Sequence, residues 1–229
     1  HGDSCTMSDT LRFILSLSIV FAVVIGIVRF RKIDRAYYPF IYYISLMLLV
    51  EIIVKLLMNN GLSNALIVFL NLYTLAEFSL LTWLFHAWGL FNRNKTIFVS
   101  VLGAFVVAWG VVTLFIENVF TPNYLFRILY SFALVFFSVS TFNKMVVHHR
   151  GRIFRNAQFW ICLGIIIFFT FFLLDCSTKL TLLGLTTSNV FRANLHKIIV
   201  FSNLLVNILY AVAVIWIPRK KNFMTRFSL

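Results

Sequence analysis

Long apolar stretches separated by short polar breaks dominate this sequence. Each stretch holds about 20 mostly apolar residues, the length that an α-helix needs to cross the hydrocarbon core of a bilayer. The stretches are Leu11–Phe30, Tyr37–Met58, Ala65–Leu90, Ile97–Phe115, Tyr124–Val147, Ala157–Cys176 and Leu195–Ile217. The pattern therefore predicts seven transmembrane helices.

The breaks between the stretches contain residues that favour turns. Asn59–Gly61 and Thr121–Asn123 combine asparagine with glycine or proline, and Pro218 ends the last stretch. Most connections are short, so helices that follow one another in sequence should run antiparallel. The longest connection, Ser177–Asn194, is rich in Thr, Leu and Ser, and we expect a short interfacial segment there.

The composition supports this membrane interpretation. Of the 229 residues, 61% are hydrophobic and 12% are charged, whereas soluble domains have about 45–50% apolar and about 25% charged residues. So few polar residues cannot cover a water-soluble domain of this size. The expected fold is an all-α integral membrane protein, with residues 7–229 as one seven-helix domain and residues 1–6 as a tag remnant.

A net charge of +13 raises the possibility of nucleic-acid binding, but the basic residues lie in short runs between the apolar stretches. Of 20 Lys and Arg residues, 14 fall on one side of the predicted helices and four on the other. The positive-inside rule places the 14 in the cytoplasm, with the N-terminus outside and the C-terminus inside, as for a multi-pass protein of a bacterial inner membrane. These residues are Arg29, Arg31, Lys32, Arg35, Arg93, Lys95, Lys144, Arg150, Arg152, Arg155, Arg219, Lys220, Lys221 and Arg226.

The cysteines do not suggest a metal or redox site. Cys5, Cys162 and Cys176 form no paired spacing typical of zinc binding, and Cys162 and Cys176 fall within one apolar stretch. We therefore expect no metal, no cofactor and no disulfide framework. The sequence also contains no catalytic motif.

Three charged residues inside predicted spans are the strongest candidates for function, because ionisable groups in a membrane are costly. Glu51 and Lys55 are four residues apart on one helix face, where they can form an ion pair. Glu77 lies near the middle of the third predicted helix and needs a partner on another helix, a proton or water. Lys55, Lys197 and Arg127 are its candidate partners.

Polar residues form stripes on two further helices. On the last helix, His196, Asn203, Asn207 and Tyr210 fall within a narrow sector of a helical wheel. The fifth helix has a second stripe, whereas the fourth is apolar all round and is expected to face lipid or to pack closely through small residues. The second stripe contains Arg127, Ser131, Ser138 and Thr141, with Tyr130 adjacent.

Most of these polar groups fall in the predicted outer half of the bundle. This distribution predicts a polar cavity open to the outside that binds a small molecule or a lipid. The candidate ligand-binding residues are Glu51, Lys55, Asn71, Glu77, Arg127, Lys197, Asn203 and Asn207.

The chain resembles the seven-helix membrane sensor modules that accompany bacterial histidine kinases. The resemblance rests on the seven short-looped spans, on the Tyr-Tyr-Pro-Phe sequence at Tyr37–Phe40, and on the run from Asn71 through Glu77 to Trp88 and Gly89. It implies a receptor-like protein that signals through a separate cytoplasmic or membrane partner.

Three other interpretations remain open on the sequence alone. A small-solute transporter or an intramembrane hydrolase would also use polar groups embedded in the membrane. In the third interpretation the protein binds nothing at these positions, and the polar stripes only join neighbouring helices by hydrogen bonds. A retinal protein needs a lysine near the middle of the last helix, whereas Lys197 is expected to be only the third residue of that helix.

Overall fold

The computed structural model describes residues 18–92, 94–148, 153–180 and 189–220. Within these ranges the chain forms seven α-helices, and π-helical η3 (Val112–Ile116) extends α5. Short 3₁₀ turns η1 (Phe30–Lys32), η2 (Arg35–Tyr37) and η4 (Ile153–Arg155) occupy two of the connections. The α-helices are α2 (Ile19–Arg29), α3 (Tyr38–Asn59), α4 (Ser63–Ala87), α5 (Lys95–Val111), α6 (Tyr124–His148), α7 (Ala157–Lys179) and α8 (Asn189–Trp216).

Six of the helices in the described ranges are long and apolar enough to cross a membrane, as expected for a multi-pass membrane protein. The seventh, α2, has 11 described residues, and the remainder of the predicted stretch Leu11–Phe30 lies outside the described part of the chain. The all-α prediction is confirmed for the described residues, and the helix count agrees with the seven predicted stretches.

The ends of α7 and α8 differ from the sequence prediction. Helix α7 continues to Lys179 and α8 already begins at Asn189, so both enter the predicted connection Ser177–Asn194. The predicted interfacial segment falls largely on residues 181–188, which lie outside the described residues. Lys197 is thus the ninth residue of α8, and its expected place as the third residue is wrong.

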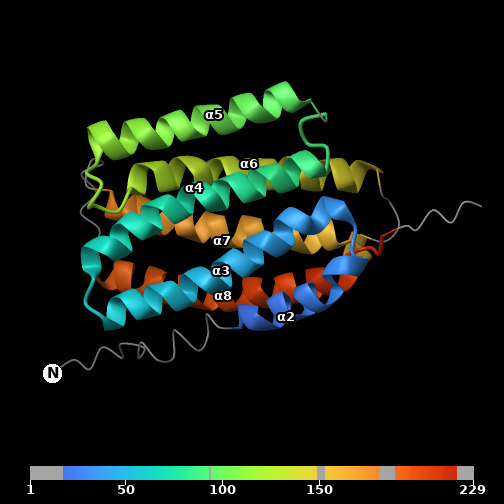
Figure 1. The fold of residues 1–229 in the computed structure, drawn as a ribbon, viewed down its shortest axis with the longest axis horizontal. Coiled ribbons are helices and arrows are strands. Elements are labelled where there is room, and N and C mark those ends of the chain that lie inside the picture. The colour runs from blue at the N-terminus through green and yellow to red at the C-terminus, as the bar shows by residue number, and fades with distance from the viewer. Residues whose placement is uncertain (1–17, 93, 149–152, 181–188, 221–229) are drawn as a thin grey trace, which may run out of the picture.

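Six helices form a closed ring around a packed centre. The principal neighbours are α2 with α3, α3 with α4, α4 with α6, α6 with α7, α7 with α8, and α8 with α2. Figure 1 shows the helices side by side along the long axis, with successive connections at alternating ends. Sequence neighbours are therefore antiparallel, as the short connections predict.

Helix α5 lies outside this ring, against α4 and α6 (Figure 1). No residue of Lys95–Val111 is buried, which agrees with the lipid-facing prediction for this apolar helix. A Cβ atom added at Gly103 or Gly110 would meet nothing within 4 Å. The alternative prediction, that small residues pack this helix closely, is therefore wrong for these two glycines.

Aromatic side chains fill the centre of the ring. Tyr43 of α3, Tyr130 of α6 and Tyr210 of α8 are fully buried, and the rings of Tyr43 and Tyr210 are 6.1 Å apart. Tyr210 fits against α7 because Gly164 has no side chain: a Cβ atom there would lie 2.6 Å from Cε1 of Tyr210. Glycine at position 164 thus allows α7 and α8 to approach.

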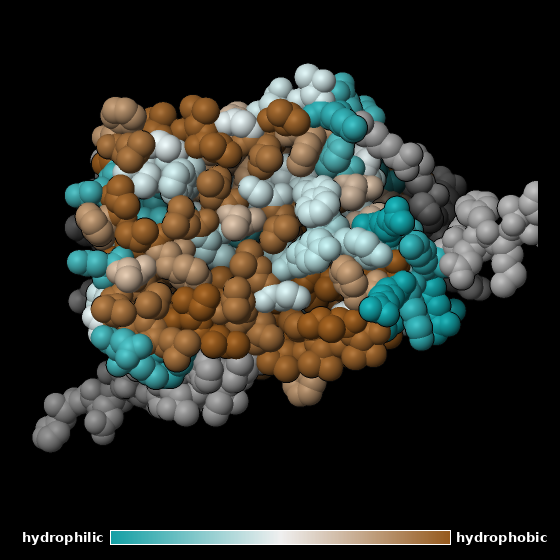
Figure 2. Space-filling view, in the orientation of Figure 1, coloured by the Kyte–Doolittle hydropathy of each residue, from teal (hydrophilic) through white to brown (hydrophobic). Residues whose placement is uncertain are grey.

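One end of the bundle is basic, and several of its cations bind the chain itself. Nη1 of Arg29 donates to the carbonyl oxygens of Val214 and Ile215, both at 2.7 Å, at the C-terminal end of α8. A cation at this position satisfies free carbonyls and complements the helix dipole. Figure 2 shows hydrophilic residues gathered at this end and a largely hydrophobic flank.

Backbone and side-chain contacts join further segments at this basic end. Ile33 and Arg219 form an isolated antiparallel bridge, which holds the α2–α3 connection against the segment after α8. Arg155, between α6 and α7, lies 6.0 Å from the ring centre of Trp216. The basic end, defined by Arg29–Arg35, Lys95, Arg155, Arg219 and Lys220, thus brings together positions that the sequence analysis placed on one side of the membrane.

Replacing Gly164 tests the contact between α7 and α8. Gly164→Ala should lower the free energy of unfolding in detergent by about 1–3 kcal/mol, because the ring of Tyr210 must move. The matched control is Gly103→Ala on α5, where the new methyl group meets open space and alanine favours the helix. Equal melting temperatures for the two variants would contradict this packing.

Candidate functional site

The most deeply buried acidic group in the described chain is Glu77 on α4, which is 3% exposed. Three tyrosine hydroxyls donate to its carboxyl oxygens. Tyr73 lies one turn earlier on α4 and reaches Oε1 at 2.8 Å, and Tyr130 of α6 reaches Oε2 at 2.9 Å. Tyr43 of α3 makes a longer contact of 3.5 Å with Oε1. We call these four residues the Glu77 cluster.

The Glu77 cluster lies near the middle of the bundle's long axis. Glu77 is the fifteenth of the 25 residues of α4. Tyr130 lies about 9 Å along α6 from its first residue at the α5–α6 connection, whereas Tyr43 lies about 8 Å along α3 from its first residue at the basic end. The tyrosine side chains therefore reach Glu77 from both halves of the bundle.

Arg127 is a cation that acts electrostatically on Glu77. It is half-buried near the start of α6 and interacts electrostatically with Glu77 and with Glu117 in the α5–α6 connection. Burial raises the pKa of the Glu117 carboxyl, and backbone hydrogen bonds and Arg127 oppose that shift. Among the described residues no Lys or Arg forms an ion pair with Glu77, so tyrosines take the place of the predicted partners Lys55, Lys197 and Arg127.

Asn71 holds the α5–α6 connection against α4. Its Nδ2 donates to the carbonyl oxygens of Val119 and Thr121, at 3.3 and 3.0 Å, and its Oδ1 accepts from the backbone N–H of Asn123. Asn123 is itself buried and donates to Thr113 in the π-helical turn at 2.6 Å. The side chain of Asn71, predicted to bind ligand, is thus occupied by the protein's own backbone.

Glu51 and Lys55 lie one turn apart on α3, and both are half-buried. Glu51 is close enough to Tyr73 to act on it electrostatically, and Tyr73 in turn donates to Glu77. Glu51 therefore belongs to the polar surroundings of the Glu77 cluster. Lys55, four residues further on, extends this polar strip of α3 toward the α3–α4 connection.

The residues of α8 that were predicted to bind a ligand lie in different environments. Asn207 is buried and donates to Oγ of Ser18 at 2.8 Å, which links α8 to the start of α2. Asn203 is half-buried one turn earlier, and Lys197 is exposed despite its position well inside the helix. The side chain of His196 lies outside the described residues. Tyr210, the fourth member of the stripe, is fully buried, and its ring lies 6.1 Å from that of Tyr43, which donates to Glu77. The structure therefore brings this stripe toward Glu77 through Tyr210, whereas Asn207 bonds to Ser18.

Hydroxyl groups of the α6 stripe mostly bond within their own helix. Ser131 donates to the carbonyl oxygen of Arg127 at 2.6 Å, and Thr141 donates to that of Phe137 at 2.8 Å. Such bonds satisfy a hydroxyl without a partner from another helix. Ser138 is fully buried on the same stripe. Tyr130 is the member of this face that reaches Glu77.

A layer of apolar side chains separates the Glu77 cluster from the basic end. Phe78, Leu81, Leu84 and Phe85 follow Glu77 on α4, and all four are fully buried. Phe85 also packs against the rings of Trp88 and Phe137. His86 is stacked on Phe98 of α5, with ring centres 4.5 Å apart, away from the Glu77 cluster. Thr82 on the same segment of α4 is also fully buried, so this packed layer is mainly apolar and contains a buried hydroxyl group.

The tyrosines are the part of the site that sequence reasoning missed. Tyr73 is four residues before Glu77 and so lies on the same helix face, which is a signal that the sequence contained. Tyr43 and Tyr130 lie 34 and 53 residues away in sequence, and no local pattern links them to Glu77.

Chemically, the Glu77 cluster offers a buried hydrogen-bond acceptor whose present donors are replaceable hydroxyls. A charged donor, such as the ammonium group of a bound amine, forms stronger hydrogen bonds to a carboxylate than a neutral hydroxyl does and can compete for the same oxygens. Comparison of the chain with protein-family models, with curated proteins and with solved structures finds no match.

Tyr130→Phe removes the hydroxyl that reaches Oε2 of Glu77. The variant should unfold with a free energy about 1–2 kcal/mol lower than the wild type, since a buried acceptor loses its donor. Tyr42→Phe is the matched control because Tyr42 is exposed on α3. Thermal unfolding in detergent measures both, and equal destabilisation of the two variants would contradict the role of the bond.

Proposed function

We propose that this chain is a receptor-like sensor of a bacterial inner membrane. A small polar molecule enters from the outer half of the bundle, donates to Glu77 and displaces a tyrosine hydroxyl. The protein then shifts between two packings of its helices, and a separate partner detects the shift at the basic end. The observation that carries this proposal is a fully buried carboxyl group held by tyrosines of three helices.

A purely structural role explains Glu77 less well. The packed aromatic centre of the ring would suit an apolar residue at this position, and replacing buried charged groups by apolar ones is often neutral or stabilising. A carboxyl group in a membrane protein is costly to bury and is a candidate for function by default. Its retention is better explained by a ligand or a switch than by stability.

Helix α6 offers a direct route from the Glu77 cluster to the basic end. Tyr130 binds Glu77, and Lys144, which is 14 residues further on, donates to the carbonyl oxygen of Leu90 at 3.2 Å. The two positions are about 21 Å apart along one rigid helix. Movement of α6 upon loss of the Tyr130 bond would therefore alter the contact with the α4–α5 connection.

The packed layer beside Glu77 favours a sensor over a transporter. A transporter needs a polar route to the basic end in one of its states, whereas Phe78, Leu81, Leu84 and Phe85 present buried apolar surface there. A sensor requires only that the outer half exchange ligand while the inner half stays closed.

A thermal-shift screen in detergent tests the ligand role of Glu77. At least one amine- or hydroxyl-bearing small molecule should raise the melting temperature of the wild type by several degrees, and Glu77→Gln should abolish this increase. A ligand that binds only the folded protein should raise the free energy of unfolding by about 2.7 kcal/mol when its concentration is 100 times its Kd.

Asp175→Asn is the control for that screen. Asp175 is also a carboxylate at the outer end, but it is paired with Lys179 on α7 at 2.6 Å. This variant should keep the ligand response. An identical response in Glu77→Gln, or no response of the wild type to any compound of a broad panel, would count against the proposal.

The proposed orientation, with the basic end in the cytoplasm, is tested by cysteine labelling in a Cys5→Ser background. Asn64 is exposed at the start of α4 and Lys95 is exposed at the start of α5, which follows the opposite end of α4, and the native Cys162 and Cys176 are buried. An impermeant maleimide should label Asn64→Cys in intact cells and Lys95→Cys only after permeabilisation. The reverse result would place the basic end outside and overturn the proposed orientation.

A further inference from the structure

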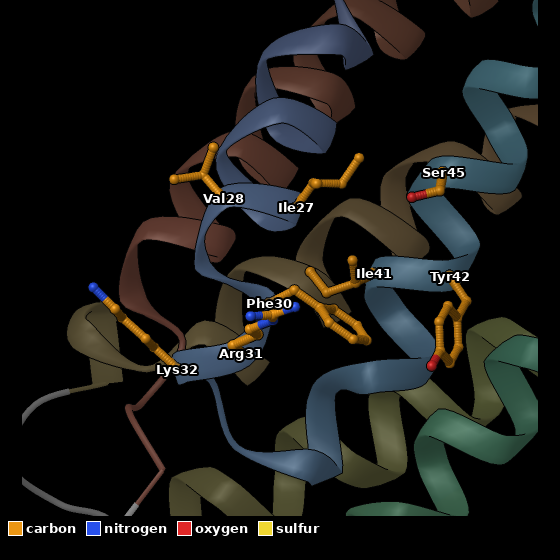
Figure 3. A pocket seen from close by; sticks show the side chains of 8 residues that line it. All are labelled: Ile27, Val28, Phe30, Arg31, Lys32, Ile41, Tyr42 and Ser45. Atoms are coloured by element: carbon orange, nitrogen blue, oxygen red, sulfur yellow. The ribbon is translucent and has the colours of Figure 1, made fainter.

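A groove on the outside of the ring lies between α2 and α3 next to the basic end. Its volume is about 490 Å³, within the range of small-ligand sites. Ile27 and Val28 of α2 and Ile41 and Ser45 of α3 are among its lining residues. Figure 3 shows the side chain of Ile27 directed toward α3 and that of Val28 on the far side of α2, with Phe30 and Arg31 at the turn that joins the two helices. The groove does not include any residue of the Glu77 cluster.

The groove changes in character along its length. The end near Ser45 has apolar walls, and the hydroxyl of Ser45 points toward α2 (Figure 3). The other end has the guanidinium of Arg31 beside Phe30, and Lys32 lies at the rim with its ammonium directed away. An apolar channel that ends at a cation matches a molecule with a hydrocarbon chain and an anionic head.

The flanks of the groove show that it is reached from the bilayer. Val28 is 76% exposed and Ile27 is 60% exposed, so the α2 side presents apolar surface to the surroundings. On the α3 side Tyr42 is stacked on Trp83 of α4, with ring centres 6.2 Å apart. Tyr and Trp prefer the interface between hydrocarbon and water, which places Arg31 at the depth of lipid phosphates.

Charge at this end favours an anionic lipid. Arg31, Lys32 and Arg35 are exposed within five residues, and Asp34 is the acidic residue among them. Oδ1 of Asp34 accepts from the backbone N–H of Ala36 and so caps the turn η2. Basic pockets between transmembrane helices are suited to anionic head groups, and an arginine fork matches phosphate geometry.

We infer that this groove is a binding site for an anionic phospholipid of the leaflet at the basic end. The phosphate contacts Arg31, and one acyl chain lies between Ile27 on one side and Ile41 and Ser45 on the other. The bound lipid would fill the gap between α2 and α3 at the point where Arg29 caps α8. This site is independent of the ligand proposed for Glu77.

Native mass spectrometry of the full chain in detergent tests the inference, with dioleoyl phosphatidylglycerol and dioleoyl phosphatidylcholine as probes. The wild type should retain phosphatidylglycerol more tightly than phosphatidylcholine. Arg31→Gln should weaken phosphatidylglycerol binding about five- to tenfold, as expected for the loss of one cation at a phosphate. Lys95→Gln, which removes a cation from the same end but outside the groove, should leave it unchanged.

A second pair of variants tests the apolar part of the site. Ser45→Phe fills the groove and should reduce retention of both lipids, whereas Val99→Phe adds the same ring to an exposed position on α5 and should not. Equal retention of the two lipids by the wild type, or equal losses in Arg31→Gln and Lys95→Gln, would overturn the site. Displacement of the lipid by inorganic phosphate alone would show a soluble-anion site and overturn the lipid assignment.

Discussion

A carboxyl group inside a ring of apolar helices has to find hydrogen-bond donors within the protein, because neither lipid nor the packed centre supplies them. In this chain the donors are tyrosines from α3, α4 and α6, and meeting this requirement fixes how those helices stand relative to one another. Tyrosine is suited to the task because its ring fills apolar space and its hydroxyl reaches the acceptor. The same residues thus pack the centre and satisfy Glu77.

The two ends of the bundle are closed by different interactions. At one end Asn71 and Asn123 hold the α5–α6 connection through short side-chain contacts. At the basic end Arg29 caps α8, and the bridge between Ile33 and Arg219 joins segments from the two halves of the chain. Free helix carbonyls and loop carbonyls need partners wherever water is scarce, and these residues supply them.

The proposed ligand site and the proposed lipid site occupy different parts of one small protein. The Glu77 cluster lies inside the ring near the middle of the bundle, and its contacts are hydrogen bonds from tyrosine hydroxyls. The groove at Arg31 lies outside the ring and faces the bilayer. Helix α3 contributes Tyr43 to the first and Ile41 to the second, so occupancy of either site bears on the same helix.

The sequence by itself determined the helices, since a stretch of about 20 apolar residues has few alternatives to a membrane-spanning helix. It also singled out Glu77, because a carboxyl group near the middle of such a stretch is conspicuous. For α5 its uniform apolarity left two alternatives, facing lipid or close packing, and the exposed side chains of the structure agree with the first. The sequence predicted the start of α8 six residues late, at Leu195 instead of Asn189, since polar residues can continue a helix beyond its apolar part.

Only the tertiary structure decided which groups meet. A helical wheel gives the face of a residue but not the neighbour of that face, so the ring order that brings Tyr130 to Glu77 could not be read from periodicity. For the same reason Asn71 was expected to bind a ligand, whereas it holds a connection about 50 residues away in sequence. Contacts between distant segments depend on how the helices pack, and local patterns carry no information about that.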